Sequence, residues 1–178
     1  MRIGDVLYFS PRYRFEDLNL DDSEAMIAAL DDRLVGFYLD PASRLIATND
    51  AFAAGLLCCA AIDFIALCAG VDGEEWLQEN VEAFGEATRA QQFWRKFRHG
   101  LVHEGRIKPL GEFSFDLPDL LTVAGPTMIV NPTRLHEATQ HGFSHYLRSL
   151  DEAGTEKLLK RLRRYFGAEV ALVRADSS

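Results

Sequence analysis

The stretch that decides the fold is AFAAGLLCCAAIDFIALCA, residues 51–69. It is apolar on nearly every side of a helix, as is typical of a helix buried at the centre of a protein. Asn49 or Asp50 can cap its beginning, and Gly70 can end it. Asp63 interrupts the apolar run, which favours a core helix over a membrane span. We therefore predict a buried central helix over residues 51–69.

Helical periodicity recurs on both sides of this segment. The residues after about Glu86 place Phe93, Phe97 and Leu101 at steps of four, with Trp94 beside them, so one face of that helix is expected to face the core. We predict further helices over residues 24–39 (stopping before Pro41), 74–84, 86–104 (ending at Gly105), 131–150 and 155–166.

The sequence pattern changes after Gly105. Extended structure is favoured by the alternation in residues 113–115 and by the β-prone residues 121–123 and 128–130, with a turn at Gly125-Pro126. Short strands are also predicted within residues 5–10 and 169–174. The sequence thus predicts a mainly α protein with one domain over residues 1–178. We expect a helical bundle of about five or six helices and a small β hairpin or ribbon after residue 105.

Composition narrows the class of protein. The 178 residues are 48% hydrophobic and carry a net charge of −8, which argues against avid, non-specific nucleic-acid binding but leaves room for a local basic cleft. Cys58, Cys59 and Cys68 all lie in the apolar run, so we expect reduced core thiols and neither a disulfide framework nor a zinc site. No signal-peptide pattern opens the chain, and we expect a cytoplasmic protein that does not bind membranes.

The candidate catalytic residues lie in the stretch FRHGLVHEG, residues 97–105. Arg98 can hold a phosphate through two hydrogen bonds, and His103 can move a proton near neutral pH. On an α-helix, however, five positions turn through about 500°, so the two side chains would diverge by roughly 140°. They could share one groove if the helix unwinds at His103, or if a two-fold dimer combines two copies. The alternative is structural, with Arg98 paired to an acid and His103 at the end of the helix.

Asp63 is the second informative residue, because an ionised carboxylate without a partner is costly in an apolar helix. It should face a cation, with Arg98 as the first candidate and Arg95 as the second. Such a pair could orient Arg98 for function or could be a purely structural ion pair, and the sequence leaves both open.

Residues 49–105 resemble the HEPN (higher eukaryote and prokaryote nucleotide-binding) superfamily in their apolar helix with one acid and their long helix ending in Arg98, His99 and His103. In catalytic members such a motif cleaves RNA without metal, by attack of the ribose 2′-hydroxyl on the adjacent phosphate. The resemblance implies a metal-independent endoribonuclease in which Arg98, His99 and His103 are catalytic and Asp63 orients Arg98. It also implies a homodimer formed through the helix over residues 86–104, which carries these residues and is called the motif helix below.

We expect RNA or a nucleotide as the ligand, with Arg95, Lys96 and Arg106 as further nucleic-acid contacts, and no cofactor. An endoribonuclease of this kind would act in defence or in a toxin–antitoxin pair, with an antitoxin as partner. A non-catalytic nucleotide-binding or protein-interaction module on the same bundle is the alternative function. His99 and His103 have the spacing of two metal ligands, but Glu104 lies outside the pair and we predict no metal site.

Overall fold

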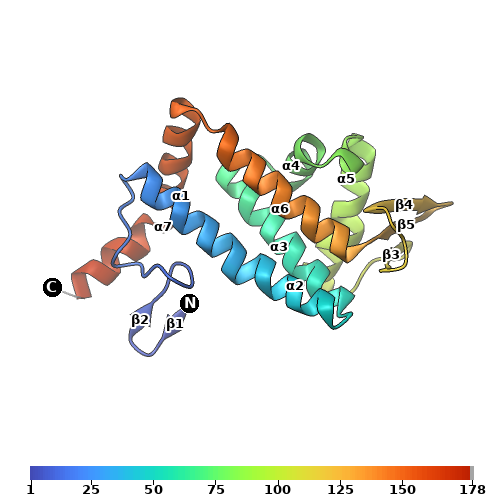
Figure 1. The fold of residues 1–178 in the computed structure, drawn as a ribbon, viewed down its shortest axis with the longest axis horizontal. Coiled ribbons are helices and arrows are strands. Elements are labelled where there is room, and N and C mark those ends of the chain that lie inside the picture. Colours follow the sequence, from blue (N-terminus) through green and yellow to red (C-terminus); the bar gives the residue numbers. More distant parts are fainter. Residues whose placement is uncertain (177–178) are drawn as a thin grey trace. The chain divides into compact units, whose positions relative to one another are not determined.

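The computed structural model describes residues 1–176, which form six helical runs and two small sheets, confirming the mainly α fold. The chain divides into two compact units, one made of residues 1–37 with the C-terminal residues from 146 on, the other of residues 38–145 (Figure 1). Both boundaries fall inside helical segments, which is why the sequence shows no linker between the units.

The centre of the second unit is helix α3 (Ala51–Ala69), with the predicted bounds and with Gly70 ending it in the left-handed conformation. It packs against α2 (Asp40–Ala47) and α4 (Gly73–Asn80). By length and composition α3 could cross a membrane, but 56% of its most apolar window is buried inside the protein, as in a core helix.

The next helical run differs from the uniform α-helix predicted over residues 86–104. Helix α5 (Ala87–Phe93) is followed by two π-helical turns, η3 (Trp94–Arg98) and η4 (Gly100–Glu104). In a π-helical turn each hydrogen bond spans five residues, so the backbone is wider than an α-helix. The predicted core face is nevertheless confirmed, because Phe93, Phe97 and Leu101 are buried.

Gly100 explains how the chain accommodates the wide turns. After Gly105 ends the run with a φ of 64°, the chain folds back over the helix, and Arg106 donates its backbone N–H to the carbonyl of Gly100 at 3.1 Å. A side-chain Cβ at position 100 would lie 2.3 Å from the carbonyl oxygen of Arg106. Only glycine allows this approach.

The predicted ribbon is present. It contains β3 (Gly111–Phe113), β4 (Leu121–Ala124) and β5 (Thr127–Val130) in the order β3-β5-β4, with β4 antiparallel and β3 parallel to β5. Phe113 packs against Phe97 with ring centroids 5.0 Å apart, which fixes the ribbon beside the motif helix. Helix α6 (Pro132–Ser149) follows, and Asn131 caps its beginning with a side-chain oxygen that accepts the N–H of Thr133.

The first unit contains the short strands β1 (Arg2–Ile3) and β2 (Val6–Leu7) and the helices α1 (Ser23–Leu34) and α7 (Glu152–Asp176). The strand predicted over residues 169–174 is wrong, because α7 runs through it. Val170 is buried and continues the face of Leu158, Leu162 and Phe166 at steps of four, so packing outweighs the β-prone composition.

The helix predicted to stop before Pro41 also continues. A π-helical turn, η1 (Val35–Leu39), leads directly into α2, and Pro41 lies in the first turn of α2. A missing backbone N–H is harmless there, since the first turn of a helix has no partner for it.

Candidate functional site

The candidate site is built around the guanidinium of Arg98. Its Nε donates to Oδ2 of Asp63 at 2.9 Å, and its Nη1 lies 2.8 Å from Nε2 of His103. The predicted partnership of Asp63 with Arg98 is therefore confirmed, whereas Arg95 does not contact Asp63. The arginine links the central helix α3 to the last turn of the motif helix.

The π-helical turns are the reason that Arg98 and His103 meet. An α-helix would separate side chains five positions apart, but hydrogen bonds that span five residues bring position i+5 close above position i. The backbone N–H of His99 donates to the carbonyl of Trp94, and that of Gly105 donates to Gly100, each five residues back. The predicted divergence of about 140° is thus wrong, and a second copy of the chain is not needed to bring the two residues together.

The contact also fixes the proton on the imidazole. A guanidinium has only donors, so Nε2 of His103 must accept the hydrogen bond from Arg98. A neutral ring that accepts through Nε2 carries its proton on Nδ1. His103 is thus held with its unprotonated nitrogen toward Arg98, in the form that can take up a proton.

The site lies at the protein surface. The side chains of Arg98 and Asp63 are 21% and 34% exposed, and His99 and His103 are exposed. Asp63 is thus only partly buried, although the sequence suggested a buried carboxylate. A guanidinium has five N–H donors, and three of those on Arg98 form no hydrogen bond within residues 1–176. Those donors can serve an oxyanion.

Two aromatic contacts complete the site. Its guanidinium carbon lies 5.6 Å from the ring centre of Trp94, within the range of a cation–π contact. The ring of His99 lies 5.3 Å from that of His103, tilted by 39°. From the sequence, Trp94 was expected only beside the core face of the helix, although a residue four positions before an arginine on a helix is also placed to contact that arginine.

The three cations predicted to contact nucleic acid are in different situations. Arg95 is exposed and has no hydrogen bond or ion pair among the described residues. Lys96 is only 6% exposed, and its ammonium donates to the carbonyls of Leu110 and Pro126, so it does not lie on an open surface, and its contact with nucleic acid stays a prediction. Its stem follows the buried face of the helix beside Phe97.

Arg106 is exposed and paired. Its Nη2 lies 2.9 Å from Oε2 of Glu104, and Nζ of Lys108 lies 2.7 Å from the other oxygen of that carboxylate. The hydrogen bonds from Lys108 and Arg106 hold the pKa of Glu104 below its ordinary value. Arg106 is thus part of a surface ion network next to His103.

Among residues 1–176, no group of three or more His, Cys, Asp and Glu side chains is arranged to hold a metal ion. The chain matches no family model, and no curated protein or solved structure is significantly similar to it. The resemblance to the HEPN superfamily therefore rests on the motif residues and the helices that carry them.

Proposed function

We propose that this protein is a metal-independent endoribonuclease of the HEPN type, with Arg98 and His103 as its catalytic pair. The observation that carries the proposal is the contact of one partly exposed guanidinium with both Asp63 and Nε2 of His103. An arginine suits a phosphodiester because it keeps its charge and presents paired donors, and a neutral imidazole beside it suits proton transfer.

In the proposed reaction, the free donors of Arg98 hold the non-bridging oxygens of the scissile phosphate. When the guanidinium turns from His103 to the phosphate, Nε2 becomes free to take the proton of the ribose 2′-hydroxyl. The O2′–P bond then forms and the P–O5′ bond breaks, and the imidazole returns the proton to the departing 5′ oxygen. Negative charge that builds on the phosphorane is stabilised by Arg98, which Asp63 holds in place.

His99 is proposed to help position the phosphate, since its exposed ring lies beside that of His103. The homodimer remains a prediction that rests on the resemblance alone, because Arg98 and His103 already meet within one chain. An antitoxin partner and a role in defence are likewise proposed from the resemblance.

The proposal is tested by incubating purified protein with end-labelled RNA in EDTA and identifying the new ends. We expect cleavage without added metal, with a 2′,3′-cyclic phosphate on one product and a 5′-hydroxyl on the other. Cleavage that requires Mg²⁺ or leaves a 5′-phosphate would contradict the mechanism. RNA binding without cleavage would instead favour a non-catalytic binding module.

A further inference from the structure

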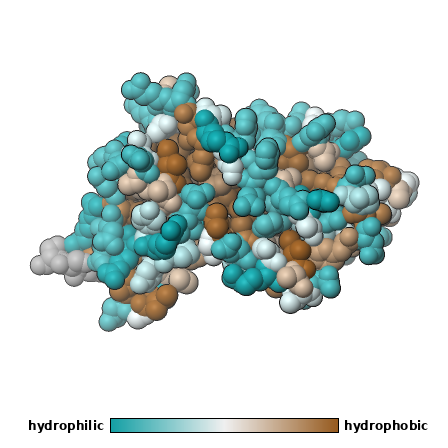
Figure 2. Space-filling view, in the orientation of Figure 1, coloured by the Kyte–Doolittle hydropathy of each residue, from teal (hydrophilic) through white to brown (hydrophobic). Residues whose placement is uncertain are grey.

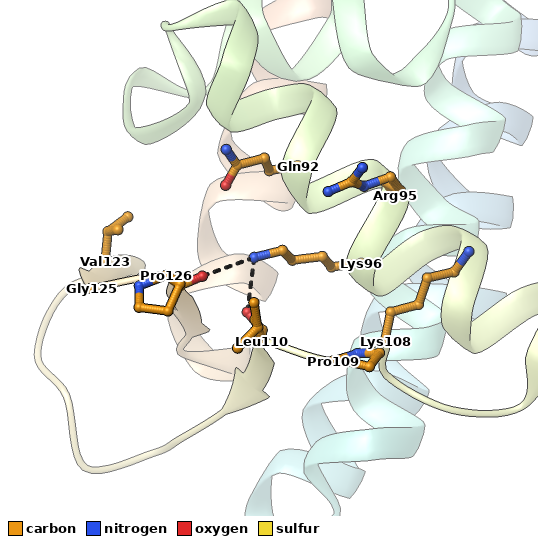
Figure 3. A pocket seen from close by; sticks show the side chains of 9 residues that line it. All are labelled: Gln92, Arg95, Lys96, Lys108, Pro109, Leu110, Val123, Gly125 and Pro126. Atoms are coloured by element: carbon orange, nitrogen blue, oxygen red, sulfur yellow. Dashed lines mark hydrogen bonds between the residues drawn. The ribbon is translucent and has the colours of Figure 1, made fainter.

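A second surface feature lies on the motif helix but does not include Arg98 or His103. It is a pocket of about 600 Å³ between α5, η3 and the β ribbon, within the size range of small-molecule sites. Figure 3 shows Gln92, Arg95 and Lys96 of the helix facing Leu110 and the turn at Pro126.

Lys96 is the unusual residue of this pocket. Only 6% of its surface is exposed, and none of the described carboxylates forms an ion pair with it. Two of its three ammonium donors bind the carbonyls of Leu110 and Pro126, at 2.9 and 3.2 Å, and the third is not used by the described residues. A buried ammonium with only carbonyl partners is incompletely compensated, so an anion at the pocket would stabilise it.

Arg95 adds a second charge at the same place. Its guanidinium points to the same side of the helix as the ammonium of Lys96, and it has no ion pair among residues 1–176. Lys108 also lines the pocket, but its ammonium points away, toward Glu104, which it shares with Arg106. Two cations without acidic partners therefore meet at the pocket, as suits a doubly charged anion.

The opposite wall of the pocket is apolar. Leu110 and Val123 are 49% and 56% exposed and line it together with Pro109 and Pro126. Figure 2 shows apolar surface left uncovered over the ribbon. Exposed apolar side chains beside cations suit a ligand with a flat, weakly polar ring next to its phosphate.

We propose that this pocket binds a phosphate monoester attached to a nucleoside, with the phosphate on Arg95 and Lys96 and the base on Leu110 and Val123. The phosphate can belong to a free mononucleotide or to the 5′ end of an RNA. The proposal does not depend on RNA cleavage, because neither Arg98 nor His103 lines the pocket.

The first test compares adenosine 5′-monophosphate with adenosine by isothermal titration and by amide NMR of the full chain. We expect the monophosphate to bind at least about ten-fold more tightly than adenosine, since charge-assisted contacts to the phosphate are lost in the nucleoside. Amide shifts should be concentrated at the pocket residues Gln92, Leu110 and Gly125. Equal binding of the two compounds, shifts elsewhere, or no binding of either the monophosphate or a 5′-phosphorylated RNA would overturn the proposal.

The second test uses Arg95→Ala, with Arg89→Ala as the matched control, because Arg89 is an exposed arginine on α5 that does not line the pocket. Only Arg95→Ala should weaken binding of the monophosphate, by roughly ten-fold. Equal effects of the two variants would contradict the proposed phosphate site.

A short RNA with a 5′-phosphate or a 5′-hydroxyl identifies the source of the bound phosphate. Preference for the phosphorylated RNA over the mononucleotide assigns an RNA end, and the reverse assigns a free nucleotide.

Discussion

At the scale of single residues, Arg98 acts through the shape of its side chain as well as through its charge. A planar fork can contact Asp63 and His103 at once, whereas an ammonium is a single point of charge. Arg98→Lys should therefore lower the rate of RNA cleavage by at least about 10²-fold. It should cost only about 1–2 kcal/mol in the free energy of unfolding, because the ion pair is partly exposed.

The measurement is a single-turnover cleavage rate together with urea unfolding of both proteins. Arg89→Lys is the control, since Arg89 forms only an exposed pair with Glu86. An unchanged cleavage rate in Arg98→Lys would show that a positive charge at position 98 is enough for cleavage.

Asp32 makes the stability of the first unit depend on pH. Burial alone would raise the pKa of Asp32, but hydrogen bonds from the Ser10 hydroxyl and from the backbone and guanidinium of Arg12 lower it overall. Because the folded pKa lies below the unfolded value of about 4, the stabilisation is present above that pH and is lost as the pH falls through the folded pKa.

Urea unfolding of wild type and Asp32→Asn at several pH values tests this directly. The difference in the free energy of unfolding should be largest near neutral pH and should shrink below about pH 4. A difference that stays constant with pH would show that the charge of Asp32 contributes nothing.

These residues also show how far the sequence could predict the site. The pairing of Asp63 with Arg98 was predictable, because a lone carboxylate in an apolar helix needs a cation. The position of Lys96 was not, since its partners are carbonyls 14 and 30 residues further on, in a ribbon whose packing no local pattern encodes.

At the scale of elements, the wide turns of the motif helix decide whether a site exists at all. Periodicity in the sequence predicted the helix and its buried face but assumed α-helical geometry throughout. The π-helical turns depend on the chain that folds back over Gly100, which is a tertiary contact.

Gly100→Ala tests this dependence, because the new Cβ would lie 2.3 Å from a backbone oxygen. We expect a loss of about 1–3 kcal/mol in the free energy of unfolding and slower RNA cleavage, as η4 carries His103. Gly167→Ala is the matched control in α7, where a Cβ meets nothing within 4 Å. It should stabilise the protein by about 0.5–1 kcal/mol. Equal stability changes in the two variants would contradict the account of the turn.

At the scale of the whole molecule, the mainly α fold followed from the periodic helices and the buried segment 51–69. The division into two units did not, because its boundaries lie inside helices and leave no change in composition. The length of α7 was missed for a related reason, since Val170 joins a packed face that only the tertiary structure supplies.

The three cysteines report on the integrity of the core. Cys58, Cys59 and Cys68 are buried and free, and burial raises the pKa of Cys58 to about 12. The thiolate is the reactive form, so the native protein should react very slowly with Ellman's reagent at pH 8. All three thiols should react promptly in urea. Rapid reaction of any thiol in the native protein would show that α3 is not a closed core helix.

In the proposed reaction, His103, held by Arg98, transfers the proton in metal-independent RNA cleavage. Single-turnover cleavage in EDTA by His103→Ala and by the control His145→Ala, an exposed histidine of α6, tests it most directly. We expect the cleavage rate to fall by about 10²–10⁴-fold in His103→Ala, with its melting temperature nearly unchanged, and not to fall in His145→Ala. Equal cleavage by His103→Ala and wild type, or a wild-type protein that cleaves no RNA in EDTA, would contradict it.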